Sequence, residues 1–349
     1  MNVPSPHKAP RRMSAVLFGL VFLAAAAGSA FGQSLDIPSK RWGLSFGNSK
    51  EFTGLRFNFR DAGVVRITGV NVTLWTPRKG DEDSIVTGLS LGLVPGAGHL
   101  RGVQLGLLGA GGMKSVVGVS GGLLGVGSGG SMTGLNFGGL GAGAGDNLIG
   151  VNLGGLGVGA GENIIGLNIG GLGAGAGENV AGISIGGLGV GAGKNVTGIN
   201  IGGLGVGAGE RLAGITVAGI GAGAKSICGL TIAGVGAGGE DIKGLTIAGI
   251  AVGAARLTGL TVAGVALGGE QLTGLHIAGA LIKVVDDGRL SGVAVSPFNH
   301  LKGTVTGLSL GIVNYAYRLE KGIQIGLINI VRDNRPGLRV LPVFNANFR

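Results

Sequence analysis

The chain has a single cysteine, Cys228, so it can form neither a disulfide framework nor a metal site built on several thiolates. Only 4% of its residues are aromatic and 13% are charged. No stripe of lysine and arginine interleaved with aromatic side chains runs along it, as a groove for nucleic acid would need. These absences argue against a disulfide-stapled protein, a thiolate metal centre and a nucleic-acid-binding protein.

Residues typical of catalytic or metal sites are few and scattered. No carboxylate or thiol lies at triad or zinc-site spacing from any of the histidines, which are His7, His99, His276 and His300. Charged residues recur at one position of a repeat, but a lysine interrupts any calcium-binding series: Asp146, Glu162, Glu178, Lys194, Glu210, Glu240 and Glu270. We therefore predict no enzymatic activity, no metal and no cofactor.

Two acidic clusters occur where the repeat described below lengthens. They are Asp81-Glu82-Asp83, where the step is 19, and Asp286-Asp287, where it is 18. Insertions of this kind usually mark exposed loops. The sequence leaves the role of these two loops open.

What the chain has in abundance is glycine, with 81 residues, and much of it recurs at a fixed period. A unit of glycine, aliphatic, variable and apolar residues repeats with a step of 16 and then of 15. We call its first residue the marker glycine; the regular series is Gly102, Gly118, Gly134, Gly150, Gly166, Gly182, Gly198, Gly214, Gly229, Gly244, Gly259 and Gly274. A period of this length is typical of a repeat architecture.

One repeat, residues 259–273, divides into three blocks of five in which apolar residues alternate with others. Alternation predicts short strands with one face buried, and the break in phase between blocks predicts corners. We therefore predict an all-β, glycine-rich β-solenoid, roughly triangular, with 15 to 16 residues per turn. Its interior is predicted to contain Leu260, Val262, Val265, Leu267 and Leu272.

The variable residue, two places after each marker glycine, is predicted to point outward, so that its copies form a ladder on the surface. The ladder consists of Asn136, Asn152, Asn168, Ser184, Asn200, Thr216, Thr231, Thr246, Thr261 and His276. Asparagine ladders exchange amide hydrogen bonds along a stack, which is a structural role. The alternative is a flat polar face that binds ice or a glycan.

The chain is predicted to divide into four segments. Residues 1–32 combine a basic start, an apolar run and small residues, the pattern of a secretory signal peptide. Residues 33–101 form an N-terminal cap with irregular repeats, 102–280 the regular array, and 281–349 irregular repeats with an aromatic-containing C-terminal cap. Residues 134–280 carry 5 basic and 7 acidic residues, so the excess of basic charge lies towards the ends.

The C-terminal stretch ends in Pro342-Val343-Phe344-Asn345-Ala346-Asn347-Phe348, and Gly-Leu-Asn-Ile-Gly or Gly-Ile-Gln-Ile-Gly units precede it. In these features the chain resembles a family of bacterial surface-repeat proteins first defined in leptospires. The resemblance covers nearly all of the chain after the signal peptide. It implies an exported protein of the cell surface or outer membrane, and it brings no activity, cofactor or catalytic residue.

We therefore predict an exported, non-enzymatic structural or adhesion-type surface protein, whose partner is a component of the cell envelope or of another surface. The sequence does not identify a ligand. A second architecture stays open at this point, a closed outer-membrane β-barrel with one repeat per strand, which would imply a permeation or anchoring role. The repeats are long enough to span a membrane as strands, but aromatic girdles are absent from the regular array.

Overall fold

The computed structural model describes residues 34–78 and 82–348, so the predicted signal peptide lies outside the described residues. Regular structure in these residues consists of β-strands. No helix in the described part of the chain is long and apolar enough to cross a membrane. The chain divides into two compact units, unit 1 up to Gly154 and unit 2 from Gly155, which we describe separately.

In unit 1, strand β1 pairs antiparallel with β2, and the turns that follow pair in parallel and in register. The strands are β1 (Ser34–Pro38), β2 (Trp42–Gly47), β3 (Glu51–Arg60), β4 (Arg66–Trp75), β5 (Ile85–Gly92), β6 (Gly96–Gly106), β7 (Gly109–Gly122), β8 (Gly125–Ser128), β9 (Ser131–Gly138), β10 (Gly141–Ala144) and β11 (Asn147–Gly154).

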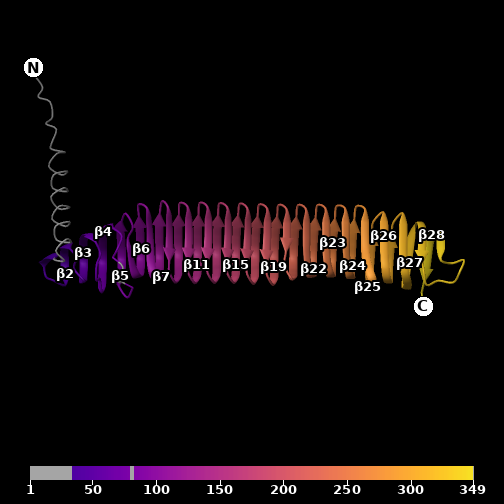
Figure 1. Ribbon diagram of the computed structural model, residues 1–349, viewed down its shortest axis with the longest axis horizontal. Coiled ribbons are helices and arrows are strands. Elements are labelled where there is room, and N and C mark those ends of the chain that lie inside the picture. The colour runs from indigo at the N-terminus through magenta and orange to yellow at the C-terminus, as the bar shows by residue number, and fades with distance from the viewer. Residues whose placement is uncertain (1–33, 79–81, 349) are drawn as a thin grey trace, which may run out of the picture. The chain divides into compact units, whose positions relative to one another are not determined.

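In unit 2 the turns again stack in parallel, as the ribbon in Figure 1 shows, and an antiparallel β28 closes the series against β27. The strands are β12 (Gly157–Ala160), β13 (Asn163–Gly170), β14 (Gly173–Ala176), β15 (Asn179–Gly186), β16 (Gly189–Ala192), β17 (Asn195–Gly202), β18 (Gly205–Ala208), β19 (Arg211–Ala218), β20 (Gly221–Gly223), β21 (Ser226–Ala233), β22 (Gly236–Ala248), β23 (Ala251–Ala263), β24 (Ala266–Ala278), β25 (Leu281–Val295), β26 (Phe298–Leu310), β27 (Val313–Val331) and β28 (Val340–Asn347).

Equivalent positions of neighbouring turns lie directly above one another. In unit 2, for example, Gly166 is paired with Gly182 and Gly182 with Gly198. The predicted all-β, glycine-rich solenoid is therefore confirmed. The alternative of a closed barrel with one repeat per strand is wrong, because neighbouring strands of an up-and-down barrel are antiparallel, whereas neighbouring repeats here are parallel.

Each regular turn consists of a long strand, a tight first corner, a short strand and a second corner. In one turn of unit 2 these are β17, Gly203-Leu204, β18 and Gly209-Glu210. The step of the repeat shortens from 16 to 15 at the second corner of the next turn, between β20 and β21. Gly207 pairs with Gly223, 16 residues on, but Arg211 pairs with Ser226, 15 residues on. The deletion therefore removes one corner residue and leaves the strands in register.

The marker glycine lies within the long strand, at a position where neighbouring turns approach closely. Gly198 has a φ of +102°, and a Cβ added to it would lie 2.1 Å from the carbonyl oxygen of Gly182. Only glycine fits such a contact, because any side chain would overlap the backbone of the turn beside it. The glycines of the short strand are less constrained; a Cβ on Gly207 would meet no atom closer than the Gly223 oxygen at 3.8 Å.

These two glycines of one turn make a matched pair. We expect Gly198→Ala to lower the free energy of unfolding by several kcal/mol, because it combines a positive φ with a backbone overlap. Gly207→Ala is expected to be neutral or to stabilise by up to about 1 kcal/mol. Chemical denaturation of both variants measures the difference, and equal stabilities would contradict the stacking described here.

The long strand places its residues on the opposite sides from those predicted. Leu267 and Leu272 are buried as expected, but Val265 is 46% exposed and Leu260 and Val262 are partly exposed. Strand β23 runs without a break through the marker glycine, so alternate residues Leu257, Gly259 and Thr261 face the same side. That side is the interior, where Leu257 is buried. The alternation therefore continues through the marker glycine, and the chain turns a corner after Ala263, between β23 and β24.

Aspartate substitutions at two adjacent residues test this assignment. Thr261→Asp would bury an unpaired carboxylate and is expected to cost several kcal/mol. Val262→Asp places the carboxylate on the outside, where water solvates it, and should cost much less. Thermal melts of both variants give the comparison, and a larger loss for Val262→Asp would show that the two faces are assigned the wrong way round.

Candidate functional site

The predicted outward ladder lies inside the coil. Each member is at most 2% exposed: Asn136, Asn152, Asn168, Ser184, Asn200, Thr216, Thr231, Thr246, Thr261 and His276. Register pairing brings Asn136 beside Asn152 in unit 1 and stacks Asn168 to His276 in chain order in unit 2. The prediction of an outward ladder is therefore wrong. Binding of ice or a glycan through it is excluded too, because no external ligand reaches these side chains.

The ladder is longer than the sequence interpretation assumed. In unit 1 the residue two places after each earlier marker glycine is also buried and in register: Ser45, Arg56, Asn71, Ser90, Gln104 and Ser120. The sequence contained a signal for this longer ladder. Each of these positions holds a polar residue, and its two neighbours in the chain point to the other side of the strand. The interior of the coil therefore contains a polar column beside its aliphatic ones.

Hydrogen bonds between turns satisfy part of this column. The Nδ2 of Asn136 donates to Oδ1 of Asn152 over 2.7 Å, and Nδ2 of Asn168 donates to Oγ of Ser184 over 3.4 Å. Neither amide atom of Asn200 has a partner, although both are buried. Unpaired buried amides cost free energy, so the column is stabilising only where neighbouring side chains match.

His276 is the largest member of the column in unit 2. It is stacked between Thr261 and the small Ala294, and both of its buried ring nitrogens lack a hydrogen-bond partner. Burial lowers the pKa of His276 to about 4, and a weaker backbone interaction with Thr273 opposes the shift. The imidazole is therefore neutral inside the coil at physiological pH.

This residue should make stability depend on pH. Its pKa is about 4 when folded and about 6.5 when unfolded, so the unfolded chain binds the extra proton between these values. His276 alone should therefore cost about 2 kcal/mol of stability when the pH falls from 7 to 5, through the same linkage. Replacing it by the neighbouring ladder residue, His276→Thr, should shrink the loss by that amount. Unfolding titrations of both proteins at the two pH values test this, and an unchanged pH dependence would contradict it.

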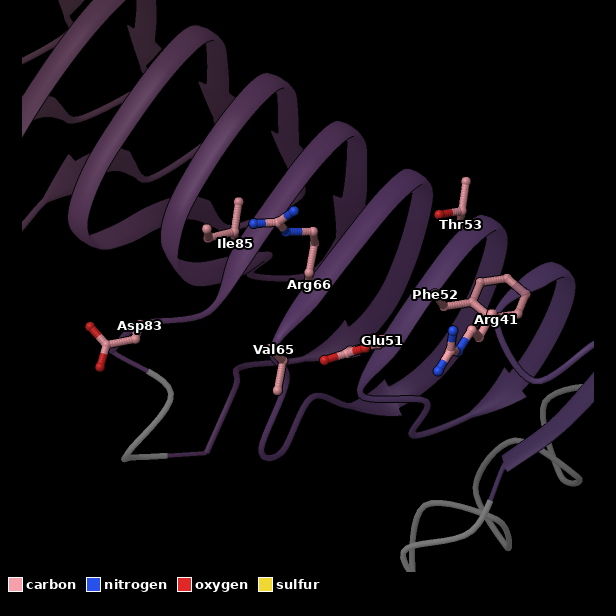
Figure 2. A pocket seen from close by; sticks show the side chains of 8 residues that line it. All are labelled: Arg41, Glu51, Phe52, Thr53, Val65, Arg66, Asp83 and Ile85. Carbon is pink, nitrogen blue, oxygen red and sulfur yellow. The ribbon is translucent and has the colours of Figure 1, made fainter.

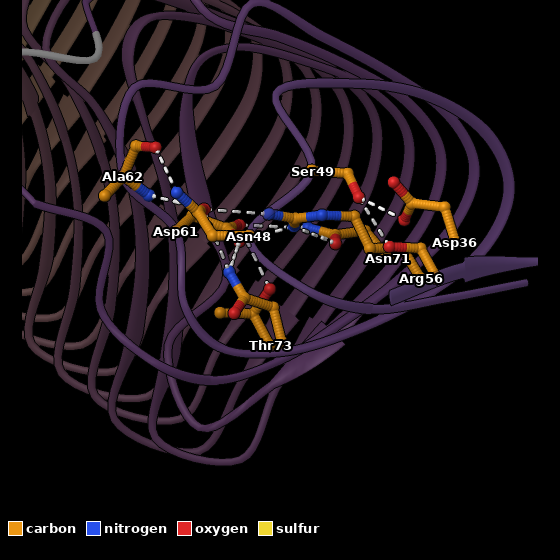
Figure 3. Close-up of polar contacts among 10 residues, drawn as sticks. Asp36, Asn48, Ser49, Arg56, Asp61, Ala62, Asn71 and Thr73 are labelled. Atoms are coloured by element: carbon orange, nitrogen blue, oxygen red, sulfur yellow. Dashed lines mark hydrogen bonds and ion pairs between the residues drawn. The ribbon is translucent and has the colours of Figure 1, made fainter. Parts of the chain in front are cut away.

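A buried ion pair forms part of the column in unit 1. Arg56 is fully buried, and its Nη1 donates to Oδ1 of Asp61 and to Oδ1 of Asn71, the latter over 2.7 Å. Thr73 donates to the other carboxylate oxygen over 3.0 Å, and Asn48 accepts from Nη2 of the guanidinium over 3.1 Å. Figure 3 shows these side chains converging inside the coil.

The pKa of Asp61 reflects a balance of opposing effects. Burial alone would raise it, but the charge of Arg56 and hydrogen bonds from Asn58, Arg56 and Asn71 outweigh burial and lower it. The carboxylate is therefore ionised and compensates the buried guanidinium. Because the two charges compensate each other inside the coil and away from solvent, we interpret this cluster as structural and not as a binding site.

An open groove lies at the surface of unit 1. It has a volume of about 440 Å³ and is lined by Arg41, Glu51, Phe52, Thr53, Val65, Arg66, Asp83 and Ile85. Figure 2 shows that these residues come from consecutive turns and from the loop that carries Asp83. The groove thus depends on the acidic insertion, whose first residue, Asp81, lies outside the described residues.

The groove can bind charged groups, but its lining offers little catalytic chemistry. Two arginines and two carboxylates provide sites for ion pairs of either sign, and Thr53 supplies the single hydroxyl among the lining side chains. Asp83 is already held by Lys114, with 2.6 Å between Oδ1 and Nζ, and this contact lowers the pKa of Asp83. Among the described residues that line the groove there is no histidine or cysteine. The arrangement favours binding over catalysis.

Two of the other charged sites singled out in the sequence form ion pairs. Lys194, which interrupts the acidic series, forms an ion pair with Glu178 of the preceding turn, 2.7 Å apart. At the second acidic insertion Asp286 lies 3.3 Å from Lys302, and the strand register shifts there. Among the described residues no group of three or more histidine, cysteine, aspartate and glutamate side chains could hold a metal ion.

Comparison of the chain with protein-family models, with curated proteins and with solved structures finds no match in any of the three. The resemblance to the leptospiral surface-repeat family therefore stays a prediction.

Proposed function

We propose that this β-solenoid is an exported, non-enzymatic repeat protein of the bacterial cell surface or outer membrane, with a structural or adhesion-type role. One observation carries the proposal: the coil presents the same side chains outward in turn after turn. Ile183, Ile199 and Ile215, for example, occupy one position of successive turns and are each about 40% exposed. A surface repeated in this way suits many weak, equivalent contacts rather than one pocket.

Further support comes from the grooves and from the sequence. The groove of unit 1 has binding chemistry, and a second groove of about 740 Å³ lies in unit 2 beside β28, lined in part by Asp333, Arg335 and Phe344. Residues 1–32 have the pattern of a signal peptide. A component of the envelope or of an opposing surface is the partner that fits a long, repetitive face. No nucleic acid or cofactor enters the proposal.

Export makes a specific prediction about the N-terminus. Mass spectrometry of the protein isolated from its own cells should find a new N-terminus within a few residues of Gln33, because small residues precede that position. An exported fraction that retains Met1 would contradict the signal-peptide assignment. Surface exposure is tested separately by labelling intact cells with an amine reagent that does not cross membranes. Exposed lysines such as Lys194 should react, while a cytoplasmic control protein should not.

A further inference from the structure

Unit 2 presents an aliphatic face, which we define by the outward residues one, three and six places after the marker glycines. Sixteen of these side chains are between 37% and 51% exposed: Leu156, Ile169, Leu172, Ile183, Leu188, Ile199, Ile201, Leu204, Ile215, Ile220, Ile232, Val235, Ile247, Ile250, Val265 and Leu275. Parallel, in-register pairing stacks them in ranks, two on the long strand and one at the first corner. The ranks form one continuous surface of leucine, isoleucine and valine.

The aliphatic face is larger than the apolar patches that a monomeric protein normally exposes to solvent. Together these side chains expose on the order of 1,000 Å² of aliphatic surface, whereas the largest apolar patch of a typical monomer is about 300–600 Å². A specific protein interface buries about 800 Å² on each partner. The aliphatic face is therefore large enough for a stable interface within unit 2 alone.

The composition around the face favours protein over lipid as its partner. Residues 155–280 contain no phenylalanine, tyrosine or tryptophan, so the aromatic residues that anchor proteins at a lipid interface are missing. The same stretch carries six acidic and five basic residues, so it offers no excess of positive charge to an anionic membrane. On the long strand the rank one place before the marker glycines borders the face, and it mixes polar residues such as Thr197, Lys243 and Thr258 with apolar ones such as Ile165.

A second copy of the chain matches the geometry of the face. The ranks repeat at the spacing of parallel strands, about 4.8 Å, and an identical face repeats at the same spacing, so leucine and isoleucine side chains can interdigitate along its length. Two β-sheets pack face to face about 10 Å apart. A two-fold axis that lies in the plane of the interface and runs across the ranks brings each rank against its own copy, and the ranks contain no charge that would be buried.

We propose that the aliphatic face of unit 2 is a homodimer interface, in which two copies pack sheet against sheet around a two-fold axis. The inference does not depend on the location of the protein or on its role at a surface. It explains why the apolar side of each strand can face outward, since the second copy removes it from water.

The oligomeric state of the purified protein tests the proposal. Sedimentation equilibrium in detergent-free buffer should give twice the mass of the chain. The variant Ile183→Lys with Ile215→Lys places two charges on the face, two turns apart, and should raise the dissociation constant at least 100-fold. The control, Gly175→Lys with Gly207→Lys, adds the same charge at the same separation on the outward side of the short strands, where an added Cβ meets no atom closer than 3.6 and 3.8 Å, and it should stay dimeric.

Circular dichroism and thermal melts establish that the variants fold. If the lysine variant unfolds, Ile183→Thr with Ile215→Thr keeps β-branched side chains and should still weaken the dimer relative to the wild type. A wild-type protein that has the mass of one chain at 100 µM would overturn the proposal, as would a folded face variant as dimeric as the control. A single-chain protein that floats with phosphatidylcholine vesicles would also overturn it and would show that lipid covers the face.

Discussion

The structure depends on the contact between marker glycines of neighbouring turns. At Gly214 the position that a Cβ would occupy lies 2.3 Å from the carbonyl oxygen of Gly198, and the same contact recurs along both units. Because the strands are parallel and in register, this close contact falls at the same position of each turn. That position is therefore restricted to glycine in each repeat. This explains why glycine recurs at a fixed step despite its entropic cost in strands.

The marker glycine also decides which side chains can lie beside it. Residues two places before and after it share its inward direction, and the interior there is narrow. Small polar residues fit after the glycine, and their amide or hydroxyl groups can bond to the copies above and below. His276 and Arg56 are the exceptions in size: the first is followed by Ala294, and the second is neutralised by Asp61. The aliphatic residues one and three places after the marker glycine are directed outward, while the aliphatic residue two places before it, such as Leu257, is buried.

Much of the fold could be predicted from the sequence, but the direction of the ladder could not be read from polarity alone. The period, the strands and the burial of Leu267 and Leu272 follow from spacing and alternation. The error arose from the assumption that apolar residues mark the inside of every strand. Continuous alternation from Leu257 through Gly259 predicts a buried Thr261, and that signal outweighs hydrophobicity here. The Arg56–Asp61 pair and the groove depend on contacts between turns and on loop conformation, which spacing does not specify.

The inversion of polar and apolar sides has a functional consequence. A soluble solenoid usually hides its aliphatic residues and varies its surface, whereas this coil hides a polar column and repeats an aliphatic surface. Contacts between marker glycines, helped in places by hydrogen bonds within the column, hold the turns in register, and that register aligns the outward leucines and isoleucines into ranks. The regular arrangement of the outward side chains therefore depends on contacts inside the coil. A partner must match a periodic, uncharged face along many turns, which is a requirement that a repetitive or extended partner meets and a compact small molecule does not.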